Sequence, residues 1–332
     1  MLGIIANPSS GKDIRRLVAQ GTVFDNMEKV NIIQRILSVL NYAGVKEICY
    51  MQDSYQIVDR AVTYLERNFK INLRIKELEI KYRYEQNDSL LAASSLLQMG
   101  ASCIVTLGGD GTNRVVAKGC GDTPLIPLST GTNNVFPVML EGSVAGFAAA
   151  VADIDKKHEY LKLKQKKRLN IYKNGVLVDI ALIDAVITEE RFIGSRALWE
   201  PETIKEIFVT VAKPDSIGMS AIAGSIYPIS EDEQKGLYVW LGNNGNVETN
   251  AAIAPGLIQN IKIEGYSEIG LEQKVNIKTK TGIVALDGER EITFGKNDKV
   301  VIGLSNDGPK VVDVGGTLVA AAKEGYFKGR WR

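Results

Sequence analysis

The amino-acid sequence predicts a two-domain α/β protein, in which a parallel sheet covered by helices is followed by a β-sandwich. With 332 residues, the chain exceeds the usual size of one domain. Short apolar runs alternate with helical patterns over the first 150 residues, whereas strand-like runs dominate beyond about residue 155. The segment Gly316–Phe327 returns to a helical pattern. We therefore expect an α/β domain over residues 1–155, to which residues 310–332 return, and a β-sandwich over residues 156–309.

The elements of the first domain follow from apolar spacing and capping residues. Apolar runs predict five strands: Leu2–Ala6, Glu47–Met51, Ile75–Tyr82, Cys103–Leu107 and Pro124–Leu128. Apolar residues at i, i+3, i+4 and i+7 from Ile33 predict a helix over Glu28–Ala43 that ends at Gly44. Further helices are expected over Ser54–Phe69, with Ser54 as N-cap, and from Asp88 to Met99. This alternating order favours a parallel sheet with helices on both faces.

Turn residues separate the strands that we expect in the second domain. Asn174-Gly175 is a strong hairpin signal between the runs Leu169–Tyr172 and Val176–Ile187. Further strands are expected at Ile207–Ala212, Leu237–Leu241, Ile258–Ile263, Gly282–Leu286 and Val300–Leu304. Their spacing is typical of an all-β sandwich.

Composition excludes several classes of protein. Forty basic and thirty-nine acidic residues give a net charge of +1, which argues against a nucleic-acid or membrane binder. Three cysteines without a CxxC pattern and one histidine argue against a disulfide framework and a zinc site, so we expect no protein-bound metal. No basic leader precedes the first apolar run, and no apolar run approaches the ~20 residues that span a bilayer. We expect a cytoplasmic protein.

A group of basic residues lies at the expected junction of the two domains: Lys156, Lys157, Lys162, Lys164, Lys166, Lys167 and Arg168. Leu161 and Leu163 alternate with lysines, which favours a strand with a solvated lysine face. A phosphate-binding patch is the alternative, because the group lies beside the expected cleft.

The segment Gly108-Gly109-Asp110-Gly111-Thr112 carries the clearest chemical signal. It lies between a buried strand and a helical pattern, and its glycines let backbone N–H groups approach an anion at a helix N-terminus. Asp110 does not suit a simple phosphate cradle, because a carboxylate repels phosphate unless a cation intervenes or it serves an acceptor hydroxyl. Both roles indicate phosphoryl transfer. The alternative is a glycine turn in which Asp110 caps the helix.

Two other loops follow expected strands. Asn7-Pro8-Ser9-Ser10-Gly11-Lys12 follows the first strand, and Ser129-Thr130-Gly131-Thr132-Asn133-Asn134 follows Pro124–Leu128. Ligands of open α/β sheets bind outside the carboxyl ends of the strands, so the three loops could converge. Each loop alone is equally compatible with ordinary turn chemistry. The sequence contains neither a Walker A loop nor a Gly-x-Gly-x-x-Gly fingerprint.

Together these motifs resemble the superfamily of NAD kinases and diacylglycerol-type lipid kinases. The opening Gly-Ile-Ile-Ala-Asn-Pro-Ser-Ser-Gly-Lys is similar to that of ATP-NAD kinase-like proteins of the acetoin-catabolism X type. The resemblance implies a Rossmann-like α/β domain, a C-terminal β-sandwich and an active site in the cleft between them. It also implies ATP, Mg²⁺ and NAD as ligands, and a homodimer or homotetramer.

The resemblance assigns a role to each matching residue. It implies that Asp110 acts on the acceptor hydroxyl. It implies a site for phosphates or nucleotide made by Asn7, Ser9, Ser10, Gly11, Gly108, Gly109, Gly111, Thr112, Gly131, Thr132, Asn133 and Asn134. Acceptor-binding positions are Asp184, Ala223 and Asp287. Ile183 replaces the asparagine of NAD kinases, and Met219 replaces a tyrosine, so the NAD-contacting residues are altered.

We interpret the sequence as a kinase that transfers a phosphoryl group from ATP or polyphosphate to a hydroxyl of NAD or a related small molecule. A second hypothesis is a nucleotide-binding regulatory protein of acetoin catabolism that has no turnover; the altered acceptor residues motivate it. A third is a lipid kinase, whose loops Gly-Asp-Gly-Thr-Asn-Arg and Gly-Thr-Asn-Asn resemble. It ranks last because no cationic amphipathic stretch suited to a membrane surface stands out.

Overall fold

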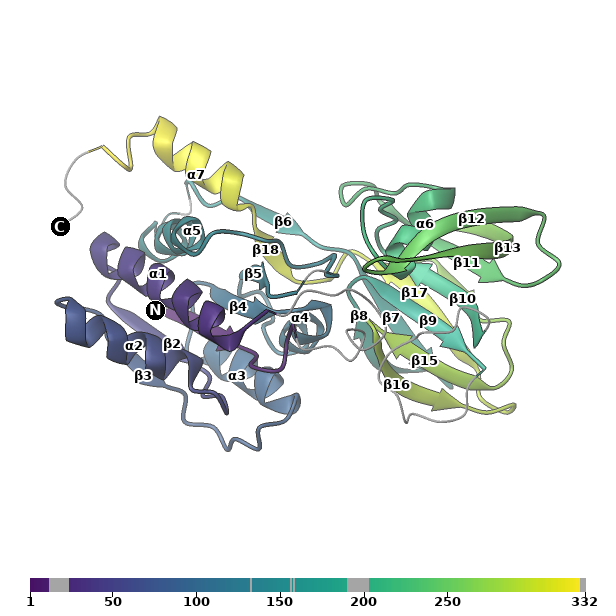
Figure 1. Ribbon diagram of the computed structural model, residues 1–332, viewed down its shortest axis with the longest axis horizontal. Helices are drawn as coiled ribbons and strands as arrows, with labels where there is room; N and C mark the ends of the chain where they lie inside the picture. Colours follow the sequence, from purple (N-terminus) through teal and green to yellow (C-terminus); the bar gives the residue numbers. More distant parts are fainter. Residues whose placement is uncertain (12–23, 132, 156, 158, 190–202, 329–332) are drawn as a thin grey trace.

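The computed structural model describes residues 1–11, 24–131, 133–155, 157, 159–189 and 203–328 of the chain. Two lobes lie side by side along the long axis of the molecule (Figure 1). The first lobe contains a sheet with helices on both of its faces, and the second contains two antiparallel sheets. The predicted fold class, a parallel α/β domain followed by a β-sandwich domain, is confirmed.

The first sheet has the strand order β3-β2-β1-β4-β5-β18-β6. Its strands are β1 (Leu2–Ala6), β2 (Glu47–Tyr50), β3 (Arg74–Glu77), β4 (Ile104–Gly108), β5 (Leu125–Ser129), β18 (Lys310–Val312) and β6 (Leu163–Gln165). All pairs are parallel except β18–β6. The chain runs outward from β1 to β3 on one side and from β4 to β5 on the other. This reversal between β1 and β4 is the point where open α/β sheets bind ligands.

Helices cover both faces of this sheet. On one face lie α1 (Asn26–Ala43), α2 (Ile57–Asn68) and α5 (Gly142–Ile154), and on the other lie α3 (Asn87–Gln98) and α4 (Asp110–Ala117). The terminal helix α7 (Val314–Lys323) packs on α5, as the sequence predicts. Each face therefore has its own apolar core.

The five predicted strands and the predicted helices of this domain are all present, but three local details differ. The third strand is shorter than the expected Ile75–Tyr82, because β3 ends at Glu77. Asp53, not Ser54, satisfies the start of α2: its carboxylate accepts the N–H groups of Tyr55 and Ile57 at 2.8 and 2.9 Å. The helix α5 was not predicted, because its run of alanines and glycines lacks an apolar–polar period.

The second lobe consists of two antiparallel sheets. The larger has the order β12-β13-β11-β10-β9-β15-β16, and the smaller β14-β17-β7-β8. The strands are β7 (Arg168–Lys173), β8 (Val176–Ala181), β9 (Asp184–Thr188), β10 (Ile204–Val209), β11 (Lys235–Leu241), β12 (Val247–Ala254), β13 (Leu257–Gly270), β14 (Lys274–Asn276), β15 (Gly282–Leu286), β16 (Glu289–Phe294) and β17 (Val300–Ser305). Apolar side chains from both sheets share one core. The short helix α6 (Met219–Ile226) covers the other face of the larger sheet.

The hairpin prediction holds for its turn but not for the full length of its second strand. Asn174 and Gly175 both have positive φ, 54° and 84°, between β7 and β8, as a two-residue hairpin requires. The expected run Val176–Ile187 divides into β8 and β9, which lie in different sheets.

The boundary between the domains differs from the predicted one. β6 pairs with β18 in the first sheet, although the sequence-based division places residues 163–165 in the second domain. Lys164 is exposed there, as expected, but Leu163 is exposed as well, so β6 lacks the expected alternation of buried leucine and solvated lysine. Lys167 is buried. Its Nζ donates to three backbone oxygens of one loop, those of Ser230, Glu233 and Lys235, at 2.7–3.1 Å. The chain therefore crosses between the domains immediately after β6.

Three charged side chains hold the chain where it crosses between the domains. Glu231 accepts from Lys166 at 2.5 Å and from Lys213 at 2.9 Å. Burial alone would raise the pKa of Glu231, but the two ammonium groups outweigh burial and lower this pKa to about 2. An acid whose pKa is lowered on folding stabilises the fold above its unfolded pKa and loses this contribution as pH falls.

We expect Glu231→Gln to lower the thermal unfolding midpoint at pH 7 and to have a smaller effect at pH 3. The wild-type carboxylate loses its contribution between about pH 4.5 and about pH 2. Differential scanning calorimetry at both pH values measures the difference. Glu248→Gln, at a side chain that is 53% exposed, is the control and should change little at either pH. A Glu231→Gln effect of equal size at both pH values would contradict this assignment.

Candidate active site

The three predicted loops meet at one edge of the first sheet. Asn7 Nδ2 donates to Thr112 Oγ1 at 2.9 Å, which joins the loop after β1 to the first turn of α4. The hydroxyls of Ser10 and Thr130 lie 2.7 Å apart, which joins the same loop to the one after β5. The predicted convergence is therefore present, because β1, β4 and β5 are parallel neighbours whose carboxyl ends share this edge.

Glycines allow the loops to pack this closely. A Cβ on Gly11, which has φ +69°, would lie 2.2 Å from the backbone oxygen of Thr130. A Cβ on Gly109 would lie 2.8 Å from Oδ1 of Asn134, whose Nδ2 donates to Ser129 Oγ at 2.8 Å. At Gly11 the neighbouring backbone excludes a larger residue, whereas at Gly109 a Cβ would force the Asn134 side chain to shift.

The other predicted loop residues lie in the same place. Gly108 packs on the side chain of Thr112, and Gly131 lies beside Asn134. Ser9 is exposed and Asn133 is half-buried. Thr132 and the loop residue Lys12 lie outside the described residues.

Asp110 is the first residue of α4 and does not cap it. The N-cap is Gly109, which has no side chain to serve the helix. The Asp110 carboxylate instead accepts the N–H groups of Val135 and Phe136 through Oδ1, at 3.1 and 2.8 Å. The capping alternative is therefore wrong. Asp110 is half-buried at the edge where the loops meet, and the loop after β5 fixes the direction of its carboxylate.

Arg114 connects this helix to the second domain. Its side chain is 1% exposed, and it lies one turn after Asp110 in α4. Its guanidinium lies 3.0 Å from Asp179, 3.4 Å from Glu289 and 3.9 Å from Asp287. All three carboxylates belong to the second domain. The sequence did not single out Arg114, because nothing local shows which distant carboxylates surround it.

Asp287 organises the interior of the interface. Its side chain is completely enclosed, and its carboxylate accepts the N–H groups of Leu182, Ile183 and Asp184 at 2.8–3.1 Å. Burial raises the pKa of Asp287, while Arg114 and the three amides oppose this rise. Its predicted role as an acceptor-binding residue is not supported, because an enclosed carboxylate cannot contact a ligand.

The other two predicted acceptor positions differ from each other. Asp184 begins β9 and is half-buried next to Asp287, whose backbone N–H donates to the Asp184 carbonyl at 3.0 Å. Ala223 is completely buried in the core under α6, so its expected contact with an acceptor is wrong. Ile183, which stands where NAD kinases carry asparagine, is also buried, at 3% exposure.

Glu289 is a second residue that the sequence analysis did not assign to the site. Its Oε1 would lie 3.0 Å from a Cβ on Gly111, so it borders the glycine loop. Its Oε2 accepts from Gln86 at 2.5 Å. Glu289 lies two residues after Asp287 in the sequence, but only the fold shows that this segment reaches the first domain.

The donor set suits Mg²⁺ only when phosphates supply part of its coordination. Within the described ranges, no three His, Cys, Asp or Glu side chains are close enough together to hold a metal. Mg²⁺ commonly binds through one or two carboxylates plus substrate phosphates and water. Asp110 is the carboxylate at the loop edge that could take part. Such a metal would neutralise developing charge on a transferred phosphoryl group.

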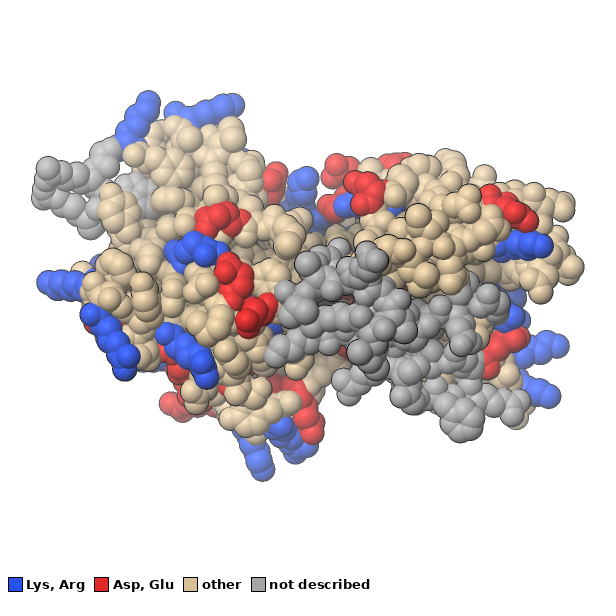
Figure 2. Space-filling model, viewed as in Figure 1, with Lys and Arg blue, Asp and Glu red and all other residues tan. Residues whose placement is uncertain are grey.

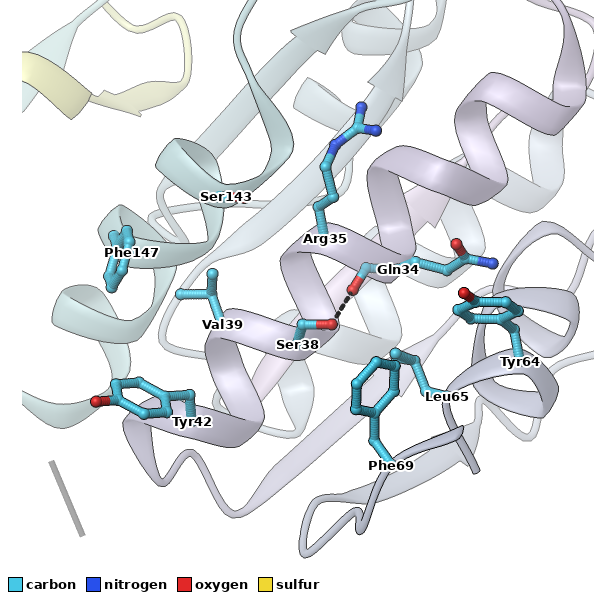
Figure 3. A pocket seen from close by; sticks show the side chains of 10 residues that line it. All are labelled: Gln34, Arg35, Ser38, Val39, Tyr42, Tyr64, Leu65, Phe69, Ser143 and Phe147. Atoms are coloured by element: carbon cyan, nitrogen blue, oxygen red, sulfur yellow. Dashed lines mark hydrogen bonds between the residues drawn. The ribbon is translucent and has the colours of Figure 1, made fainter. Parts of the chain in front are cut away.

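The surface between the domains is notched, and side chains of both charges lie at the rim of the notch (Figure 2). A separate groove of about 460 Å³ lies between α1, α2 and α5 (Figure 3). It is lined by Gln34, Arg35, Ser38, Val39, Tyr42, Tyr64, Leu65, Phe69, Ser143 and Phe147, and shares no residue with the three loops. Among the helices that the structure describes, none has the length and apolar character to cross a bilayer.

Comparisons with known proteins assign both halves of the chain. The model of the ATP-NAD kinase N-terminal domain matches residues 2–159, and that of the acetoin catabolism protein X C-terminal domain matches residues 167–307. Acetoin catabolism protein X of Cupriavidus necator is 36% identical over 97% of this chain and 92% of its own length. The chain belongs to the acetoin catabolism protein X family. The predicted resemblance is confirmed, including its NAD kinase-like first domain.

Within this family fold, we expect Arg114→Met to lower the free energy of unfolding by about 3–5 kcal/mol, because it leaves the enclosed Asp287 without its cation. Lys118, at the C-cap of the same helix, pairs with the same Asp179 but is 30% exposed. Lys118→Met should therefore lower the free energy of unfolding by at most about 1 kcal/mol. Urea unfolding measures both. Adding Asp287→Asn to Arg114→Met should recover part of the loss, and failure to recover any would contradict the charge argument.

We expect Gly11→Ala to destabilise the protein more than Gly100→Ala. Both glycines have similar positive φ, +69° and +72°, so both substitutions carry the left-handed cost of about 1–2 kcal/mol. Only at Gly11 does the new Cβ meet a backbone oxygen, whereas nothing lies within 4 Å at Gly100. Thermal unfolding midpoints compare the two. Equal losses would show that the loops separate easily and are not closely packed.

Proposed function

We propose that the chain transfers a phosphoryl group from ATP or polyphosphate to a hydroxyl of NAD or a related small molecule. The observation that supports this most is the meeting of three loops beside Asp110, at the reversal point of the sheet. The kinase-like first domain agrees with it.

In this proposal the loops bind the donor, and Asp110 serves the acceptor. Backbone N–H groups and hydroxyls of the loops after β1, β4 and β5 hold the phosphates. Asp110 orients the acceptor hydroxyl and accepts its proton as the new oxygen–phosphorus bond forms and the bond to the leaving phosphate breaks. The amides of Val135 and Phe136 keep the carboxylate in one orientation, which is the positioning that such transfer requires.

A second candidate is a nucleotide-binding regulatory protein that has no turnover. Two observations favour it. The Asp110 carboxylate already accepts two loop amides, so it also has a structural role. The buried Ile183 cannot replace the polar contact that asparagine makes in NAD kinases. Calorimetry with ATP, ADP, NAD and NADP separates the candidates when it is combined with a product assay.

We expect Asp110→Asn to lower kcat by about 10²–10⁴ while the affinity for ATP changes little. Asparagine retains Oδ1, so the bond from Phe136 N–H can persist and the loop stays in place. Product formation from ATP or polyphosphate with NAD is followed in a coupled NADP assay, and ATP binding by calorimetry. Asp122→Asn, at a side chain that is 89% exposed in the same domain, is the control.

Each outcome of this assay distinguishes the candidates. Full turnover in Asp110→Asn removes Asp110 from catalysis. A wild-type protein that binds nucleotide tightly but forms no product with NAD or other hydroxyl acceptors favours the regulatory candidate. A wild-type protein that binds no phosphate compound contradicts both.

A further inference from the structure

A buried lysine lies beneath the loop that follows β1. Lys29 belongs to the first turns of α1 and has no exposed surface. Its Nζ donates to the backbone oxygens of Asn7 and Ser10 at 2.8 Å each and of Pro8 at 3.3 Å, and to Asn26 Oδ1 at 3.0 Å. A charged donor therefore contacts three of the carbonyls in one short loop.

These contacts determine which way the loop presents its N–H groups. In a trans peptide the C=O and the following N–H point in opposite directions, and the described chain contains no cis peptide. Because the Ser10 carbonyl points at Lys29, the N–H of Gly11 points away from it. The same geometry holds for the N–H of Ser9, which donates to Asn7 Oδ1 at 2.8 Å. The N–H of Ser10 differs, because it donates to the Asn7 carbonyl at 3.4 Å. The lysine thus holds the Pro8 and Ser10 carbonyls on the side opposite the N–H groups of Ser9 and Gly11.

The same loop connects the other two. Asn7 donates to Thr112, and Ser10 lies against Thr130. Ser9 is exposed, and Ser10 and Gly11 are half-buried. A change that releases the carbonyls from Lys29 would therefore loosen the contacts that bring all three loops together.

We propose that Lys29 is a positioning residue for a polyphosphate chain, which it serves by holding the carbonyls of Asn7, Pro8 and Ser10 away from the ligand. This inference rests on the proposed function. The lysine removes negative carbonyl dipoles from the ligand side, turns the Gly11 amide toward that side, and places a positive charge beneath the loop. The ligand chemistry is a chain of linked phosphates, supplied either by ATP or by inorganic polyphosphate.

The second domain contains a matched control. Lys167 is also buried, at 4% exposure, and its Nζ also donates to three backbone carbonyls of one loop, at 2.7–3.1 Å. That loop does not contact the three site loops through any bond in the described chain. Lys167→Met therefore reproduces the structural cost of Lys29→Met without changing the phosphate loop.

Hydrogen–deuterium exchange of the ligand-free protein tests the positioning itself. We expect Lys29→Met to speed exchange in peptides that contain Asn7–Gly11, Thr112 and Thr130, while Lys167→Met speeds exchange around Ser230–Lys235. Unchanged exchange at the site loops in Lys29→Met would overturn the positioning role. This measurement needs no bound nucleotide, so it is independent of the proposed function.

Calorimetry with ATP and with inorganic tripolyphosphate tests the ligand. We expect Lys29→Met to weaken binding of both by about tenfold or more, the effect of losing one correctly oriented amide donor to a charged phosphate. Lys167→Met should stay within about twofold. Weakening of ATP alone would assign Lys29 to the nucleoside rather than to the phosphates, and equal weakening in both variants would show general destabilisation; each overturns the inference.

Two further results complete the test. Lys29→Gln keeps an amide donor without the charge, and we expect an intermediate loss of affinity; it replaces Lys29→Met if that variant does not fold. If the wild type binds neither probe while exchange still identifies Lys29 as the loop anchor, the proposed function fails and so does the polyphosphate inference. The anchoring of the loop alone would then remain.

Discussion

The buried guanidinium of Arg114 is the interaction on which the arrangement of the two domains depends. A cation without contact with water is stable only when nearby carboxylates compensate it, and the second domain provides Asp179, Asp287 and Glu289. The helix that carries Arg114 begins at Asp110, so the second domain helps to set the orientation of Asp110. The orientation of this candidate catalytic carboxylate thus depends on both domains, although the N–H groups that donate to it, those of Val135 and Phe136, belong to the first.

The order of the parallel strands explains why the loops meet where they do. β1, β4 and β5 are parallel neighbours, and the strand order reverses between β1 and β4, so the loops that leave these strands emerge at the same edge of the sheet. Asn7 and Ser10 cross this edge to reach Thr112 and Thr130. The meeting of the loops follows from this topology, and the glycines permit the close approach that it requires.

Local chemistry allowed the sequence to predict the parallel strands, the hairpin at Asn174-Gly175 and the glycine loop. Prediction from local sequence failed where a side chain interacts with residues that are distant in the chain. Asp287 was expected at a ligand, yet its three amide donors come from a strand connection that is about 100 residues earlier. Lys29 carried a usable signal, since it lies on the same helical face as Ile33, Ile36 and Leu40. A lysine on an apolar stripe more often extends its ammonium to water, so the pattern alone could not indicate a buried loop anchor.

The two halves of the site differ in how far they follow the NAD kinase pattern. On the side of the three loops, the contacts Asn7–Thr112 and Ser10–Thr130 are made by residues that the motifs contain, and residues 2–159 match the kinase model. On the acceptor side, Ile183 and Ala223 are buried in apolar cores, and Asp287 is committed to backbone amides and Arg114. In the proposed function, the polar groups left for an acceptor are Asp184, Glu289 and the loop edge itself. A carboxylate accepts a hydrogen bond from a hydroxyl, so these groups could replace the contact that the buried Ile183 cannot make.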